Sequence, residues 1–151
     1  MAAYTISGDG TNTAATTILY FVNHATTLHR LKLFEVIVGA DATADAAFQA
    51  HVRRITAENG TPGGTVAVPQ LNDPADPAAD SNAVFDPSGE PTYTAAANML
   101  IFPGHQRATI LWAPAPGREI IVPATGDNGL GWRIDTVSAT FNQVVAMRYE
   151  E

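Results

Sequence analysis

The chain has 151 residues, a formal net charge of −7 and no cysteine. This length suits one domain with one hydrophobic core, and the lack of cysteine excludes disulfides, thiol catalysis and thiolate metal sites. The 8 basic residues are not clustered, so we expect no nucleic-acid partner. Residues 18–22, the longest apolar run, are too few to span a membrane, and residues 1–4 lack the features of a secretory signal.

The first third of the chain predicts three strands. Residues 14–23 are β-branched and aromatic without a helical stripe, and residues 30–38 alternate before becoming apolar on both faces. Residues 46–56 fit either a helix or a strand. We favour a strand that follows a short helical turn at residues 42–45.

A turn cluster at residues 58–64, containing Asn59-Gly60, and a short strand at 65–69 lead into an unusual segment, residues 72–91. Four prolines and five acidic residues occur in it, with no basic residue. Each Asp-Pro step moves the aspartate out of the helical region, so we expect no regular helix. Composition alone indicates disorder, whereas the apolar pair Val84-Phe85 indicates a long ordered loop anchored on the body.

The remaining sequence predicts further strands. Residues 98–103 and 106–113 flank Gly104-His105 and favour a hairpin or a bulged pair, and residues 119–122 predict a short strand. The last strand, residues 134–149, alternates clearly, and its length leads us to expect a bend or bulge. The whole pattern predicts one all-β domain over residues 1–151: an antiparallel jelly roll or β-sandwich of eight to nine strands, with 72–91 as an inserted loop.

Motifs for catalysis or metal binding are not apparent. The histidines have no HxH or HxxxH spacing, although His24 and His29 flank one turn and can approach each other. Prolines interrupt the spacing that a calcium loop would need among Asp73, Asp76 and Asp80. No Gly-x-Ser-x-Gly motif occurs, while carboxylate pairs that meet only in space stay open. We expect no catalytic residue, no cofactor and no metal ion.

The two tryptophans have different sequence contexts. Trp112 lies in an alternating strand, which favours the core. Trp132 follows Gly129-Leu130-Gly131 at the junction of a turn and a strand. This context fits a buried core position and an exposed contact equally well. The exposed contact would be with another subunit of an oligomer or with a sugar ring.

Residues 28–151 contain a series of turn and packing motifs rather than catalytic groups. They are a strand with Phe34-Glu35 ending at Gly39, an Ala/Asp-rich stretch at 42–47, a strand ending at 53–56, the segment 68–79, Glu90-Pro91-Thr92-Tyr93, Gln106–Thr109 before Trp112, residues 115–119 and the final Glu150-Glu151. Together these motifs resemble small proteins encoded among the structural genes of tailed bacteriophages.

This resemblance implies a structural virion protein, most plausibly a head decoration (cement) protein, and not an enzyme. Such a protein is made in the host cytoplasm, lies on the outer surface of the capsid and binds the major capsid protein as a homo-oligomer, often a homotrimer. The alternative is a tail or fibre accessory module that contacts carbohydrate or a host surface. The candidate partner-contact residues are Asp73, Asp76, Asp80, Phe85, Asp86 and Trp132.

Overall fold

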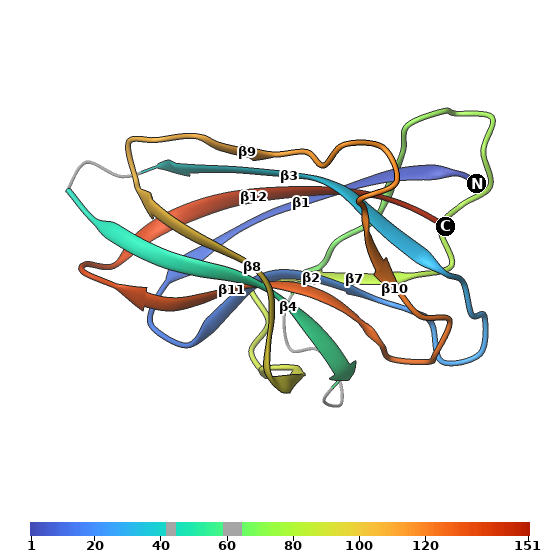
Figure 1. Ribbon diagram of the computed structural model, residues 1–151, viewed down its shortest axis with the longest axis horizontal. Coiled ribbons are helices and arrows are strands. Elements are labelled where there is room, and N and C mark those ends of the chain that lie inside the picture. Colours follow the sequence, from blue (N-terminus) through green and yellow to red (C-terminus); the bar gives the residue numbers. More distant parts are fainter. Residues whose placement is uncertain (42–44, 59–64) are drawn as a thin grey trace.

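The computed structural model describes residues 1–41, 45–58 and 65–151. These residues form two antiparallel sheets of six strands each, packed against each other with no helix (Figure 1). The predicted all-β sandwich is therefore confirmed, with twelve strands instead of eight to nine. Nowhere in the described ranges is there a helix long and apolar enough to cross a membrane.

The first sheet has the order β10-β3-β12-β1-β6, and β9 also pairs with β3. Its strands are β1 (Ala3–Asn12), β3 (Leu31–Asp41), β6 (Gln70–Leu71), β9 (Ile110–Trp112), β10 (Ile120–Val122) and β12 (Phe141–Glu150). The second sheet has the order β5-β7-β2-β11-β4-β8. Its strands are β2 (Thr16–Val22), β4 (Ala47–Ala57), β5 (Thr65–Val66), β7 (Asn82–Phe85), β8 (Thr92–His105) and β11 (Gly129–Val137).

The chain changes sheet at most of its connections. β1, β3, β9–β10 and β12 belong to one sheet, while β2, β4, β8 and β11 belong to the other. This winding is the double Greek key of a jelly roll. β9 and β10 share one edge of β3, where residues 113–119 separate them. The short strands β5, β6 and β7 form an insertion between β4 and β8.

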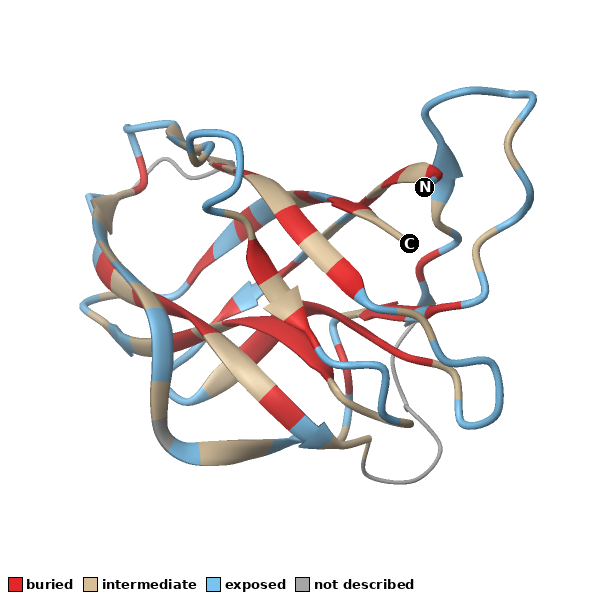
Figure 2. Ribbon diagram, turned by 45° about the vertical axis from the view of Figure 1, so that its right-hand side comes forward, coloured by how far each residue is buried: buried red, intermediate tan, exposed pale blue. Residues whose placement is uncertain are grey.

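The core lies between the two sheets, as the buried residues in Figure 2 show. β12 gives the clearest alternation, because every second residue from Phe141 to Tyr149 is buried and those between are more exposed. The buried polar residue in this series is Gln143, whose side-chain carbonyl accepts a hydrogen bond of 2.6 Å from the indole N–H of Trp132. A buried polar pair thus forms inside an otherwise apolar core.

Two predictions about strands are wrong, one about which strands pair and one about the continuity of the last strand. Residues 98–103 and 106–113 do not form a hairpin: β8 pairs with β4, and β9 pairs with β3 in the opposite sheet. The predicted strand 134–149 is two strands, because the chain leaves one sheet after Val137 and enters the other at Phe141. Alternation shows which face is buried but contains no information about the partner strand.

The N-terminal strand β1 was not predicted from the sequence. Its residues Asp9 and Gly10 lie opposite Val144 and Gln143 of β12. The expected strand at 65–69 is shorter, since β5 ends at Val66. The predictions for 42–44 and for the turn at 59–64 lie outside the described residues.

Candidate functional site

The structure describes the 72–91 segment along its whole length. Its first part, the projecting loop (residues 72–81), extends from the body beside both chain ends (Figures 1 and 2). Its second part contains β7, which pairs with β2 and β5. Val84 is buried in β7, and the Phe85 side chain lies so close to Gly8 that a Cβ there would approach it to 2.2 Å. The predicted apolar anchor is confirmed, because Val84 is buried and Phe85 packs against the core.

Backbone and side-chain hydrogen bonds fix the start of the projecting loop. The N–H of Asn72 donates to the carbonyl of Ala3 at 3.0 Å. The carboxylate of Asp73 accepts from the N–H of Ala75 at 2.9 Å, which closes a local turn. Asp73 therefore shapes the loop as well as contributing charge.

The middle and far end of the loop are tied to residues at the two chain ends. The phenol of Tyr4 donates to the carbonyl of Pro77 at 2.9 Å. The Glu151 carboxylate accepts from the N–H of Asp80 at 3.1 Å, the N–H of Ser81 at 3.0 Å and the Ser81 hydroxyl. The Tyr149 phenol in turn lies 2.6 Å from the Ser81 oxygen. β1 and β12 thus form the base on which the loop rests.

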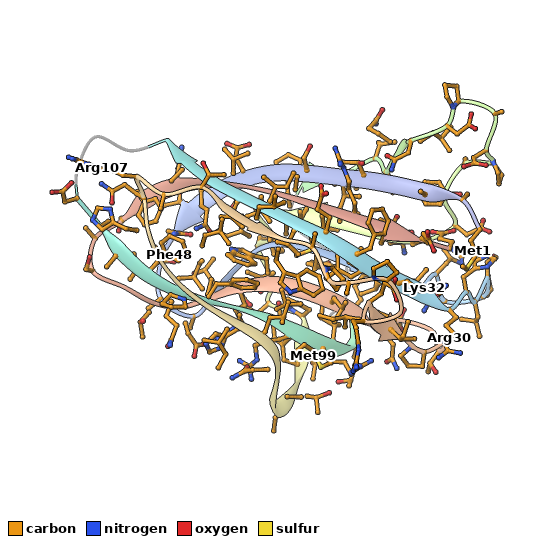
Figure 3. The ribbon with its side chains drawn as sticks, turned by 45° about the horizontal axis from the view of Figure 1, so that its top comes forward. Met1, Arg30, Lys32, Phe48, Met99 and Arg107 are labelled. Carbon is orange, nitrogen blue, oxygen red and sulfur yellow. The ribbon has the colours of Figure 1, made fainter. Side chains whose placement is uncertain are left out.

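A histidine from the β2–β3 connection completes this arrangement. His29 Nε2 lies 3.0 Å from Asp80 Oδ2. The position of His29 depends on the buried Asn23, which accepts the His29 N–H at 2.9 Å and donates its amide to the Pro123 carbonyl at 2.9 Å. Figure 3 shows Met1 at this end of the molecule and Arg107 at the other.

These groups border an open pocket of about 280 Å³, which we call the terminal pocket. It is lined by Met1, Ala2, Tyr4, His29, Asp76, Pro77, Ala78, Asp80 and Glu151. Burial raises the pKa of the Tyr4 phenol, and the negative charges of Glu151, Asp76 and Asp80 raise it further. The pocket is therefore electronegative and suited to a cation or a basic side chain. Two of the predicted residues, Asp76 and Asp80, meet here, whereas Asp73 is not among the lining residues.

The predicted contact residues Phe85 and Asp86 lie elsewhere, at the end of β7. Phe85 borders a second open pocket of about 350 Å³ with residues of β1 and β12, including Gly8 and Val144. Asp86 is exposed with a φ of 47°, and its N–H donates to the Ile18 carbonyl at 2.9 Å. These two residues are therefore separate from the acidic terminal pocket.

Trp132 requires a correction, because the sequence left it open as a surface contact. The structure buries it completely, with its indole hydrogen-bonded to Gln143 and its ring 5.2 Å from that of Phe102. A ring in this position can neither stack on a sugar nor contact another subunit. Trp112, expected in the core, is half-buried and packs against it. The alternative of a carbohydrate-binding module thus loses its principal residue.

An exposed apolar stretch leads into the projecting loop, and sequence reasoning did not identify it as a contact. Val66 and Val68 are 66% and 68% exposed, and Leu71 is 37% exposed. We call these three residues the apolar approach. The sequence signal that could have indicated this surface lies in residues 65–71. Large apolar residues occur there in a segment too short for a well-paired strand.

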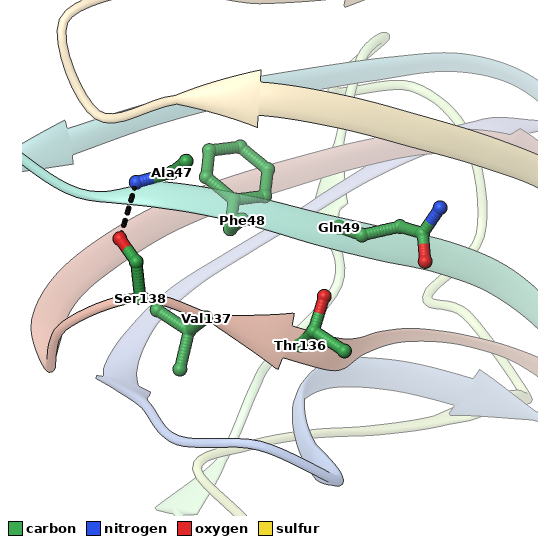
Figure 4. Close-up of a pocket in the computed structure, with 6 residues that line it drawn as sticks. All are labelled: Ala47, Phe48, Gln49, Thr136, Val137 and Ser138. Carbon is green, nitrogen blue, oxygen red and sulfur yellow. Dashed lines mark hydrogen bonds between the residues drawn. The ribbon is translucent and has the colours of Figure 1, made fainter.

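A third open pocket, of about 460 Å³, lies at the end of the β4–β11 pair (Figure 4). It is lined by Ala47, Phe48, Gln49, Thr136, Val137 and Ser138. The Ala47 N–H donates to the Ser138 hydroxyl at 2.9 Å across it. None of these lining residues carries an acidic or basic side chain.

No protein-family model, curated protein or solved structure matches the chain.

Proposed function

We propose that this chain is a structural virion protein that decorates and stabilises a tailed-phage capsid by binding the lattice of the major capsid protein as a homo-oligomer. The observation that supports this proposal best is the projecting loop, which is acidic, hydrogen-bonded to Tyr4 and Glu151 and preceded by exposed apolar side chains. A binding surface of this kind needs no reaction chemistry. The resemblance of residues 28–151 to phage structural proteins supplies the partner.

The chemistry of the loop suits a docking role. The apolar approach provides contact area, and exposed hydrophobic residues beside polar ones are typical of protein-binding sites. Asp73 and Asp80 are exposed on the adjoining loop, where they complement basic residues on a partner. Because the loop is already tied to β1 and β12, its binding costs less conformational entropy than that of a disordered segment.

Self-association strengthens such a surface. A symmetric trimer presents three copies of the loop, so contacts that are individually weak combine through their high effective concentration. The chain contains a single lysine, Lys32, and lysine is depleted in protein interfaces. This composition is consistent with a surface that is partly covered in the assembled state, although a GC-rich genome has the same effect on lysine content.

The first test is the native mass of the purified chain by light scattering, followed by co-sedimentation with capsids built from the major capsid protein encoded in the same genome. We expect a mass near three protomers and saturable binding to the capsids. A stable monomer that stays in the supernatant with these capsids would contradict the proposal.

A matched pair of variants tests the contact surface. Val68→Asp should weaken capsid binding at least tenfold, because it places a charge within the apolar approach. Leu111→Asp is the control, because Leu111 is 65% exposed in β9, outside the apolar approach. Both variants should keep the wild-type circular dichroism spectrum. Equal capsid binding by both would place the contact elsewhere.

A further inference from the structure

We propose that His29, Asp80 and Glu151 form a binding site for one divalent transition-metal ion of the zinc class. One ligand atom from each of these side chains lies within 4.8 Å of the other two. The three residues come from the β2–β3 connection, the projecting loop and the end of the chain after β12. This proposal is independent of capsid binding, and it revises the expectation from sequence that no metal ion is bound.

The spacing of the three groups is close to what a zinc ion needs. Ligand atoms at about 2.0–2.2 Å from a tetrahedral zinc are about 3.4 Å apart. His29 Nε2 and Asp80 Oδ2 are already 3.0 Å apart, and the remaining separations fall below 4.8 Å. Small side-chain adjustments therefore suffice. A metal ion would replace the hydrogen bond that His29 and Asp80 share at present.

The ligand types select among metals. Imidazole nitrogen combined with carboxylate oxygen suits zinc and its neighbours in the first transition series. Calcium and magnesium favour sites made of oxygen atoms only. Three protein ligands leave the fourth position of a tetrahedral ion open to water.

Two of the ligands are already oriented by groups behind them. The Glu151 carboxylate is fixed by hydrogen bonds from the N–H groups of Asp80 and Ser81 and from the Ser81 hydroxyl. The buried Asn23 fixes the backbone at His29. Such supporting hydrogen bonds are typical of metal sites, because they lower the cost of arranging the ligands.

The charge of the terminal pocket favours a cation. Asp76 adds a third carboxylate beside those of Asp80 and Glu151, and no lysine or arginine is among the residues that line the pocket. The raised pKa of the Tyr4 phenol reflects this negative surrounding in part. A bound divalent ion would offset the negative charge of the terminal pocket. It would also connect the projecting loop to the β2–β3 connection and to the residue that follows β12.

The test is calorimetric titration of the chelator-treated full-length chain with zinc chloride. We expect one zinc ion per chain. His29→Ala and Asp80→Asn should each lower the affinity at least tenfold. His24→Ala is the matched control, because His24 lies on the same connection, outside the cluster, and accepts a hydrogen bond from the N–H of Thr26. It should bind zinc as the wild type does.

Hydrogen exchange gives a second readout that depends on the proposed geometry. Zinc should slow exchange at the amides of residues 72–81 in the wild type and in His24→Ala, but not in Asp80→Asn. Asp80→Asn conserves size at an exposed position and should therefore keep the fold. Wild-type protein that takes up no zinc, or variants at His29 and Asp80 that bind and respond as the wild type does, would overturn the site.

Discussion

At the scale of single residues, the buried pair formed by Trp132 and Gln143 explains a polar side chain in the core. Replacing Trp132 with Phe removes the donor and leaves the Gln143 carbonyl without this partner, which should cost about 1–3 kcal/mol, together with the loss of packing. Trp112→Phe, at a half-buried position, should cost less. Urea unfolding of both variants measures the difference, and equal losses would contradict it.

Gly129 is required by the close approach of β11 to β2. A Cβ at this position would lie 1.9 Å from the Phe21 carbonyl oxygen and 2.7 Å from the Val22 Cα. Gly129→Ala should therefore destabilise the fold by about 1–3 kcal/mol, because backbone atoms must move. Gly39→Ala is the control, since nothing lies within 4 Å of the added carbon. Thermal unfolding should leave Gly39→Ala within about 0.5 kcal/mol of the wild type.

At the scale of elements, the projecting loop depends on Ser81 for its attachment to β12. Ser81→Ala removes the hydroxyl that contacts both Tyr149 and Glu151, so the free energy of unfolding should fall by about 1–3 kcal/mol. Limited proteolysis within residues 72–81 should also become faster. Ser88→Ala, at an exposed position of the same insertion, should change neither quantity. If Ser81→Ala is cleaved as slowly as the wild type, other contacts hold the loop.

The individual strands show how far sequence patterns reach. Residues 14–23, 30–38 and 119–122 were predicted as strands because β-branched and aromatic residues without helical spacing leave few alternatives. β1 was missed, because its few buried apolar side chains alternate with glycine and polar residues that also fit a turn. Its strand character comes from pairing along its whole length with β12, which lies more than a hundred residues away.

At the scale of the whole molecule, all four tyrosines make the fold sensitive to alkali. Burial raises the pKa of Tyr4, Tyr20, Tyr93 and Tyr149, and the charge of Glu58 or Glu151 raises it further at Tyr20 and Tyr149. Unfolded tyrosine loses its proton near pH 10, while the folded state retains it. The stabilisation is therefore complete below about pH 10 and is lost as the pH rises further.

The measurement is the free energy of unfolding between pH 8 and pH 12. We expect a plateau and then a decline above about pH 10, with a smaller decline in Tyr20→Phe and in Tyr149→Phe. Each variant is compared with its own value at pH 8, which separates the ionisation effect from packing. A decline of the same slope in both variants and the wild type would assign the alkaline transition to other groups.

The acidic candidates show what could be predicted of the site. Asp76 and Asp80 were selected because an acidic, proline-rich segment stands out in the sequence, and both line the terminal pocket. His29 and Glu151 were not grouped with them, since no spacing rule relates residues 29, 80 and 151. Trp132 was left open, because a tryptophan after a glycine turn has the same local sequence in the core as at the surface.

By itself the sequence determined the all-β class, most strand segments and the apolar anchor of the inserted loop. These properties follow from local alternation, turn residues and proline, which act over a few neighbouring positions. Only the tertiary structure decided the strand partners, the division of the last strand, the burial of Trp132 and the assembly of the terminal pocket. Each of these depends on contacts between segments far apart in the chain, for which alternation gives a buried face but no partner.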